Sequence, residues 1–249
     1  MDQYSVLAPF YDKLNGETDY NAIAAFLRRV FTENGIKKGS ILLDLACGTG
    51  VLTNLFAKEG YDMIGVDISP EMLFEAQDAS YKLKDKRPLY LCQDMRKLDL
   101  YGTVEAAFSC LDSLNYLEEE GDLATVFSRL KHFIAPGGIF VFDLNTAYRF
   151  RHVYGQNTYV FDEDGVFCVW QNDYNEEEKT CDFDLTFFVK DGDAYYRSEE
   201  SQRERLFEDD AVIDALEKNG FSLLATYGSP DFTPVTDKDE KRYFVVKRN

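Results

Sequence analysis

One short segment constrains the fold of this 249-residue chain more than any other. An apolar run with a single acid, Ile41–Leu45, leads directly into the glycine-rich turn Cys47–Gly50. Such a run is typical of a strand that is buried on both faces of a sheet. A short helix ended by Gly60 follows, and a second strand, Tyr61–Val66, stops at Asp67. A strand, a glycine turn, a helix and an acid-terminated strand in this order predict a nucleotide-binding α/β fold.

The residues around the turn also indicate which ligand it binds. Its glycines let the backbone approach a ligand closely, and the following helix directs its N-terminal N–H groups to the same place. Asp67 can accept two hydrogen bonds from a ribose diol. The dinucleotide fingerprint requires a third glycine where this chain has Thr53, which argues against a nicotinamide enzyme. Asp44 would instead meet an ammonium group, because an acid inside an apolar strand is costly unless it is paired.

Helices and strands continue to alternate up to about residue 145. A helix over residues 20–31 precedes the first strand, and Ser69 is the predicted N-cap of another helix. The remaining predicted elements are strands at Leu89–Leu91 and Val104–Cys110, a helix at Asp122–Ile134, and a turn at Pro136–Gly138 leading into a fifth strand, Ile139–Leu144. Strands that alternate with helices predict a parallel sheet covered on both faces.

The pattern changes in the second half of the chain. Apolar and polar residues alternate along 182–189, and turn-like separators divide residues 158–205, which together indicate an antiparallel meander. A helix at 208–219 and two closing strands at 221–227 and 243–247 follow.

The predicted fold class is therefore α/β, with a Rossmann-like seven-stranded sheet that is mostly parallel and has an antiparallel closing strand. Residues 1–150 and 206–249 would form this domain. Residues 151–205 would form an inserted antiparallel β subdomain on the substrate side.

Taken in order, these motifs resemble the class I S-adenosylmethionine-dependent methyltransferases over about residues 1–145. The run Asp44–Gly50 is similar to the first motif of that family, an acid followed by a G-x-G turn. Three further matches are Gln93-Asp94-Met95 after the third strand, Cys110-Leu111-Asp112 at the end of the fourth, and Pro136-Gly137-Gly138 before the fifth. Tyr4 and the pair Tyr11-Asp12 are similar to the opening of a subgroup of small-molecule methyltransferases.

The resemblance implies S-adenosylmethionine as the cofactor and assigns residues to it. It implies that Asp67 holds the ribose hydroxyls, that Ile68 and Met72 flank the adenine, that Asp94 meets the adenine amine, and that Tyr11 reaches the methionine part. The full implied set is Tyr11, Tyr20, Asp44, Ala46, Cys47, Gly48, Gly50, Asp67, Ile68, Met72, Gln93, Asp94, Met95, Cys110 and Leu111.

Three residues are candidates for the transfer step itself. The sulfonium already makes the methyl group electrophilic, so the main task of the protein is to orient an acceptor and exclude water. Asp112 is a candidate general base for a protonated acceptor. Tyr4 and Tyr116, together with Tyr11 and Trp170, are candidate walls of a pocket for a cation, which aromatic faces attract.

Composition excludes several other functions. The chain has 27 Lys and Arg but 45 Asp and Glu, a net charge of −18, which disfavours binding to nucleic acid or to anionic lipid. No run approaches the roughly 20 apolar residues of a membrane span, and no signal peptide is recognisable. Five cysteines without a CxxC and two histidines indicate neither a disulfide framework nor a metal site. We therefore expect a cytoplasmic protein, a monomer or homodimer.

The predicted function is methyl transfer to N or O of a small molecule. Two alternatives remain open: a methyltransferase that acts on a basic protein, and a cofactor-binding module without turnover. The acidic charge bears on this choice, because residues 162–210 hold 17 Asp or Glu and 5 Lys or Arg, a net of −12. This charge either keeps the meander soluble or selects an amine-bearing acceptor through Glu176, Glu177 and Glu178.

Overall fold

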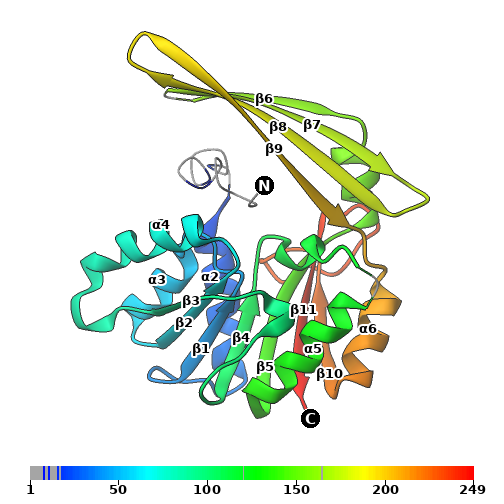
Figure 1. Ribbon diagram of the computed structural model, residues 1–249. Helices are drawn as coiled ribbons and strands as arrows, with labels where there is room; N and C mark the ends of the chain where they lie inside the picture. The colour runs from blue at the N-terminus through cyan, green and yellow to red at the C-terminus, as the bar shows by residue number, and fades with distance from the viewer. Residues whose placement is uncertain (1–7, 9–10, 12–15, 17, 120, 164) are drawn as a thin grey trace.

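The computed structural model describes residues 8, 11, 16, 18–119, 121–163 and 165–249. The first part of the chain alternates helices and strands around one sheet, as Figure 1 shows. Its elements are α2 (Tyr20–Glu33), β1 (Ile41–Leu45), α3 (Val51–Glu59), β2 (Asp62–Asp67), α4 (Pro70–Ser80), η2 (Tyr81–Lys86), β3 (Leu89–Cys92), η3 (Met95–Lys97), β4 (Val104–Ser109), η4 (Ser113–Tyr116), α5 (Asp122–Phe133) and β5 (Ile134–Asn145).

The remaining elements complete this sheet and add a second one. They are η5 (Arg149–Tyr154), β6 (Thr158–Glu163), β7 (Val166–Asn175), β8 (Thr180–Asp191), β9 (Ala194–Arg205), α6 (Asp209–Lys218), β10 (Phe221–Tyr227) and β11 (Lys241–Arg248). The first sheet has the order β10-β11-β5-β4-β1-β2-β3. Its neighbours from β5 to β3 pair in parallel, whereas β11 is antiparallel to both β5 and β10. The predicted seven-stranded, mostly parallel sheet with an antiparallel closing strand is confirmed.

The amphipathic faces of the helices explain how this sheet is covered. Phe26, Leu27 and Phe31 of α2 pack with α3 against one face of the sheet, and Val126 and Phe127 of α5 pack with α6 against the other. The sheet therefore has a separate apolar core on each face, as expected for a parallel sheet. No helix in the described part of the chain is long and apolar enough to cross a membrane.

The fifth strand begins earlier than predicted. It runs from Ile134, and the segment Pro136–Gly138 lies inside it as an irregularity, not before it as a turn. Its register with β4 changes from Val104↔Ile134 to Ala106↔Ile139, and Gly137 has a φ of 79°. A glycine that can adopt this left-handed conformation lets the strand absorb the extra residues as a bulge.

The second sheet is the predicted antiparallel meander, with the order β6-β7-β8-β9. Phe183, Leu185 and Phe187 alternate along β8 and are buried, since they pack with Phe150 and Tyr154 of η5. In Figure 1 this sheet extends above the ends of the parallel strands and is separate from the first sheet. The edge of the first sheet that lies nearest to it carries the candidate site.

Candidate active site

The turn after β1 is built from alternating left-handed residues. Ala46, Gly48 and Gly50 have φ values of 62°, 53° and 72°, and the Cys47 N–H donates to the Val66 carbonyl at 2.9 Å. A side chain at Gly50 would place its Cβ 2.5 Å from the Tyr90 hydroxyl. Gly50 therefore serves the packing of the turn against β3, and it is not among the residues that line a cavity.

Asp44 is a buried acid without a cation. It is 3% exposed, and its Oδ2 accepts a hydrogen bond of 2.5 Å from the Thr53 hydroxyl. Burial, with a further contribution from Asp67, raises the pKa of Asp44 to about 7. Among the described residues, no Lys, Arg or His forms an ion pair with it. The residue that occupies the third glycine position of the dinucleotide fingerprint thus supports this acid directly.

Asp67 joins two turns at the end of β2. One carboxylate oxygen accepts from the Gly48 N–H at 2.8 Å and the other accepts from the Ser69 N–H at 2.9 Å. Burial raises the pKa of Asp67. Ser69 caps α4 by accepting from the Met72 N–H at 3.1 Å, as predicted, so Asp67 is not needed for that purpose.

Asp94 is held by the neighbouring residue Arg96. Arg96 donates to both oxygens of Asp94, at 2.9 Å and 2.8 Å, and to Asp122 at 3.0 Å. These hydrogen bonds lower the pKa of Asp94 and keep it ionised. The segment after β3 is therefore fixed to the start of α5.

Three cavities lie at the carboxyl ends of the parallel strands. The first, of about 110 Å³, lies beyond β2 and β3 and is called the β2 cavity. The second, of about 40 Å³, lies beside the turn after β1 and is called the β1 cavity. The third, of about 1110 Å³, lies between the two sheets and is called the intersheet cavity. Tyr11 lines all three, so it lies where they meet.

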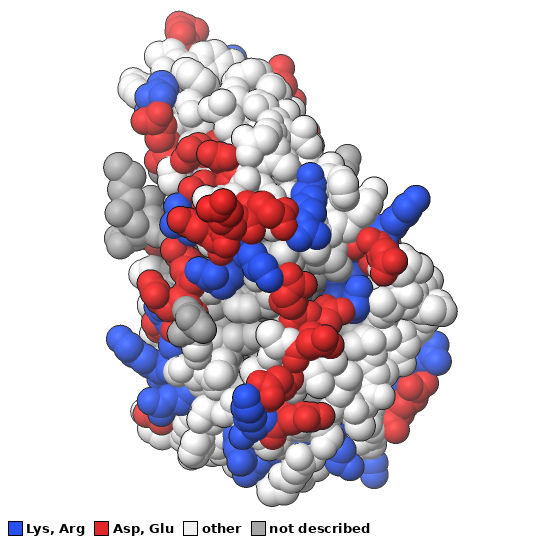
Figure 2. All heavy atoms as spheres, turned by 90° about the vertical axis from the view of Figure 1, so that its right-hand side faces the viewer, with Lys and Arg blue, Asp and Glu red and all other residues white. Residues whose placement is uncertain are grey.

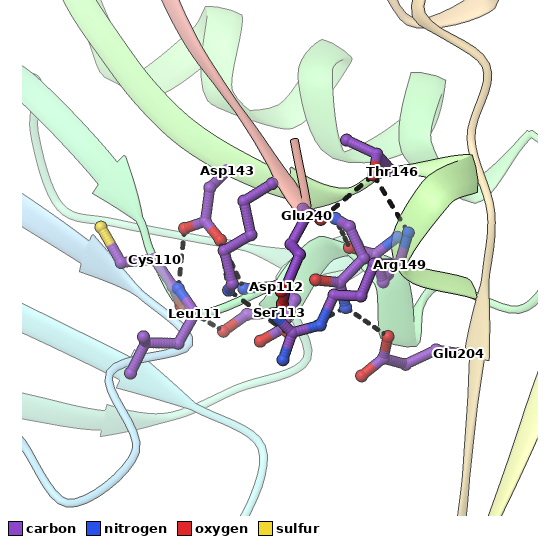
Figure 3. Close-up of polar contacts among 12 residues, drawn as sticks. Cys110, Leu111, Asp112, Ser113, Asp143, Thr146, Arg149, Glu204 and Glu240 are labelled. Atoms are coloured by element: carbon purple, nitrogen blue, oxygen red, sulfur yellow. Dashed lines mark hydrogen bonds and ion pairs between the residues drawn. The ribbon is translucent and has the colours of Figure 1, made fainter. Parts of the chain in front are cut away.

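The floor of the intersheet cavity is a turn in an unusual conformation. Leu111 and Asp112 both have left-handed φ values, 61° and 56°, which are unfavourable for residues other than glycine. The buried carboxylate of Asp143 holds them, accepting from the Leu111 N–H at 2.7 Å and from the Asp112 N–H at 3.0 Å. Figure 3 shows Asp143 directed at this turn.

Two cations lie beside the acids of this floor. Lys241 lies 2.8 Å from Asp143 and 3.5 Å from Asp112. Arg149 pairs with Glu240 at 3.1 Å and lies over the ring of Tyr154. Burial alone would raise the pKa of Asp112, but the charges of Lys241 and Arg149 outweigh it and lower that pKa. Asp112 is therefore an anion that faces the cavity, which makes it a weak general base.

The structure brings most of the predicted site residues to these cavities. The β2 cavity is lined by Asp67, Ile68, Met72, Gln93, Asp94 and Met95, and the β1 cavity by Tyr20, Asp44, Cys47, Cys110 and Leu111, with Ala46 and Gly48 lining both. Asp112 and Trp170 line the intersheet cavity.

The other candidates lie in different places. Tyr116 lines the β2 cavity, and its hydroxyl donates to Gln202 of β9 at 3.0 Å. Tyr4 lies outside the described residues. Glu176 is in an exposed ion pair with Arg151, and among the described acids of 162–210 only Glu163 lines the intersheet cavity.

The acids of the meander thus belong largely to its outer surface. Figure 2 shows acidic and basic side chains interleaved on one face of the molecule. The exposed ion pairs of the meander and the segment that follows it include Lys179 with Glu208 and Arg203 with Asp182. This arrangement favours solubility as the explanation for the net charge of residues 162–210.

Several functional candidates were missed by sequence reasoning. They are Arg96, Asp143, Asn145, Arg149, Glu204 and Lys241. One signal was present, because Asp143 is an acid inside the apolar run Ile139–Leu144, the same pattern that singled out Asp44. Arg149 and Lys241 come from segments with no motif, and only the fold brings them together.

A doubly wound sheet with its cavities at the carboxyl ends of the strands defines a nucleotide-binding Rossmann-like protein. A family model described as a methyltransferase domain matches residues 42–138. The protein of Geobacillus sp. (strain WCH70) named "Putative methyltransferase GWCH70_2453" is 30% identical over 248 residues, which cover 98% of this chain and 99% of that protein.

Solved structures agree with the sequence matches. An S-adenosylmethionine-dependent methyltransferase from Clostridium acetobutylicum ATCC 824 has a TM-score of 0.88, is 30% identical and covers 99% of both chains. The sugar N-methyltransferase KedS8 from Streptoalloteichus sp ATCC 53650 shares the fold, with a TM-score of 0.77, 23% identity, and coverage of 96% of this chain and 92% of that one. The chain belongs to the S-adenosylmethionine-dependent methyltransferases.

Proposed function

We propose that this methyltransferase transfers its methyl group to an amine nitrogen of a small molecule bound in the intersheet cavity, with a hydroxyl oxygen as the alternative acceptor atom. The observation that carries the proposal is the meeting of the three cavities at Tyr11. Two of them extend along the cofactor motifs, and the third opens towards Asp112 and Trp170. A donor in the first two and an acceptor in the third would meet beside Tyr11.

The residues present fit the two ends of S-adenosylmethionine. Asp44 is a buried acid that lacks a cation in the described chain, so it would pair with the ammonium group of the methionine part. At the other end, Asp67 would accept from the ribose hydroxyls, and Asp94 from the adenine amine. Tyr11 would lie against the methionine part, near the group that is transferred.

The walls of the intersheet cavity suit an amine. Tyr159, Phe161 and Trp170 supply aromatic faces, which attract a cationic or partly positive nitrogen, and Asp112 supplies an anion that can accept from its N–H. The fold shared with a sugar N-methyltransferase supports nitrogen as the acceptor atom. Residues 151–205, which carry these aromatic residues, would then form the acceptor-side subdomain, with 1–150 and 206–249 as the cofactor domain.

The main task of the protein in methyl transfer is to orient the acceptor. S-adenosylmethionine supplies an electrophilic methyl group. The lone pair of the acceptor nitrogen forms a bond to that carbon as the carbon–sulfur bond breaks, leaving S-adenosylhomocysteine and a proton on the product nitrogen. Holding the acceptor in line can supply roughly 7–11 kcal/mol of the barrier. Asp112 would orient the nitrogen, and the sheet above the cavity would exclude water.

The proposal is tested with purified protein, S-adenosylmethionine and matched panels of small amines, alcohols and basic proteins. Release of S-adenosylhomocysteine is measured, and the methylated atom is identified by mass spectrometry and NMR. Turnover with a small amine supports the proposal. Turnover confined to alcohols would show that the acceptor atom is a hydroxyl oxygen. Turnover confined to basic proteins would contradict a small-molecule acceptor.

Asp67→Ala is expected to weaken binding of S-adenosylhomocysteine by about 10- to 100-fold, because a charge-assisted pair of hydrogen bonds to the ribose is lost. Calorimetry measures the change. Asp62→Asn is the control, since Asp62 is the exposed first residue of the same strand. If Asp67→Ala binds S-adenosylhomocysteine with wild-type affinity, Asp67 does not contact the ribose.

Cofactor affinity is expected to fall as the pH is lowered below about 7. In the free protein the pKa of Asp44 is raised to about 7 by burial, and pairing with an ammonium group would lower it. Binding then releases a proton below pH 7, so the dissociation constant should rise towards tenfold per pH unit. Titrations with S-adenosylhomocysteine between pH 5.5 and 8 measure this slope, and a flat profile would contradict the ammonium contact.

A further inference from the structure

Strand β9 carries a buried polar stripe that faces both halves of the site. Glu200, Gln202 and Glu204 alternate along the strand, and they are 5%, 6% and 2% exposed. Gln202 accepts from the Tyr116 hydroxyl at 3.0 Å and donates to Glu200 at 2.7 Å. Glu204, at the end of the stripe, reaches the floor of the intersheet cavity, as Figure 3 shows.

Glu204 and Asp112 share one hydrogen-bond donor. The side-chain amide nitrogen of Asn145 lies 2.7 Å from Glu204 Oε2 and 2.8 Å from Asp112 Oδ2. Asn145 is 1% exposed. A primary amide has two N–H groups, so one can serve each carboxyl group. The opposite orientation of the amide would place its oxygen against the ionised carboxylate of Asp112.

The charges of this cluster do not balance if every group is ionised. Asp112, Asp143 and Glu204 are three enclosed carboxyl groups. Of the two nearby cations, Lys241 pairs with Asp143 and Asp112, whereas Arg149 pairs with the exposed Glu240. Glu204 has no ion pair within the described ranges. An unpaired buried charge is far more costly than a protonated carboxyl group, so the third group must carry a proton.

We propose that Glu204 is a positioning residue, held as a neutral carboxylic acid, that through Asn145 leaves Asp112 as the single anion of the Glu204–Asp112 pair beside the acceptor nitrogen. The identity of the acceptor rests on the proposed function, but the state of Glu204 does not. A single anion orients the N–H of a neutral amine. Two anions would stabilise the protonated ammonium form, which has no lone pair to attack the methyl carbon.

The electrostatic surroundings agree with this geometry. Burial first, and the charge of Asp112 second, raise the pKa of Glu204 well above its ordinary value, and Lys241 and Arg149 only partly oppose this. Tyr154 and Cys181 face the same carboxyl group, and burial is the first cause that raises the pKa of each of them. The charged and polar groups around Glu204 therefore come from η5, β5, β11 and the turn after β4, and together they set its pKa.

The test uses the full chain with ¹³C-labelled glutamate carboxyl groups and no acceptor. One glutamate resonance is expected to titrate well above the ordinary range of a glutamate in the wild type. It should be absent in Glu204→Gln and present in the control Glu200→Gln, which alters a buried carboxyl group on the same strand. In Asp112→Asn its midpoint should fall, because the neighbouring anion is gone, and asparagine accepts the left-handed backbone of position 112.

A second measurement is the thermal stability of the variants as a function of pH. A raised pKa means that wild-type stability falls as the pH rises towards that pKa, so Glu204→Gln should gain thermal stability relative to wild type between pH 5 and 8. An ordinary titration of Glu204, or a midpoint unmoved by Asp112→Asn, would overturn the proposal. Neither readout needs methyl transfer, so a failure here is distinguishable from a failure of the proposed acceptor class.

Discussion

Replacing Asp44 by Asn is expected to weaken cofactor binding by at least 100-fold and, at pH 8, to make the ligand-free protein more stable. The binding loss follows from removing the one charge that can pair with the ammonium group in a buried site, which is worth about 3 kcal/mol. The stability gain follows because burial raises the pKa of Asp44 to about 7 from 3.8. Calorimetry with S-adenosylhomocysteine and thermal unfolding measure the two effects.

The direction of the stability effect depends on pH. A pKa raised by folding means that the folded state holds the proton more tightly, so wild-type stability falls as the pH rises from about 4 to about 7. The difference of about three pKa units corresponds to ~4 kcal/mol. Because a buried amide also loses hydration, we expect a net gain of about 1–3 kcal/mol, or roughly 3–10 °C.

The control and the decisive comparison come from the same strand pair. Asp62→Asn changes an exposed acid of β2 and should alter neither property. The stability difference between Asp44→Asn and wild type should close near pH 4, where both carry a neutral side chain. A variant that binds the cofactor like wild type would show that Asp44 supports the turn through Thr53 and does not contact the ligand.

The sequence predicted well which residues line the β1 and β2 cavities, because these residues are local to strand ends. Asp44 and Asp67 each follow an apolar run whose burial is visible in the sequence, and parallel strands bring their carboxyl ends to one edge. Cys110 and Leu111 were placed by the same argument. What the sequence did not reveal was the support of these acids, such as Thr53 beneath Asp44 or Arg96 beside Asp94.

The surroundings of Asp112 could be predicted only in part, because they depend on contacts between distant segments. Asp112 and Lys241 meet because β11 inserts beside β5. No local sequence pattern predicts that these two strands are neighbours. Tyr116 was predicted as a wall of a pocket for a cation. It lines the β2 cavity, where its hydroxyl donates to Gln202 of the distant strand β9. The bulge at Gly137 was likewise read as a turn, since a glycine pair fits both.

Asp143 is the residue on which the floor of the intersheet cavity depends. Its side chain is 2% exposed, and it lies 2.8 Å from Lys241. The same carboxylate accepts from the N–H groups of Leu111 and Asp112. Both residues have a left-handed backbone conformation that is strained because neither is a glycine. One carboxylate therefore neutralises a buried cation and fixes a strained turn.

Asp143→Asn is expected to destabilise the protein by about 3–5 kcal/mol, because it leaves Lys241 with only the longer contact to Asp112 and turns an amide N–H towards backbone donors. Thermal unfolding should show a fall of roughly 10 °C. Glu33→Gln is the control, since its pair with Arg29 is exposed on both sides and should matter little. Adding Lys241→Met removes the unpaired cation, so the double variant should be more stable than Asp143→Asn alone. A double variant that is less stable would show that Lys241 is satisfied without Asp143, and that the turn alone accounts for the loss.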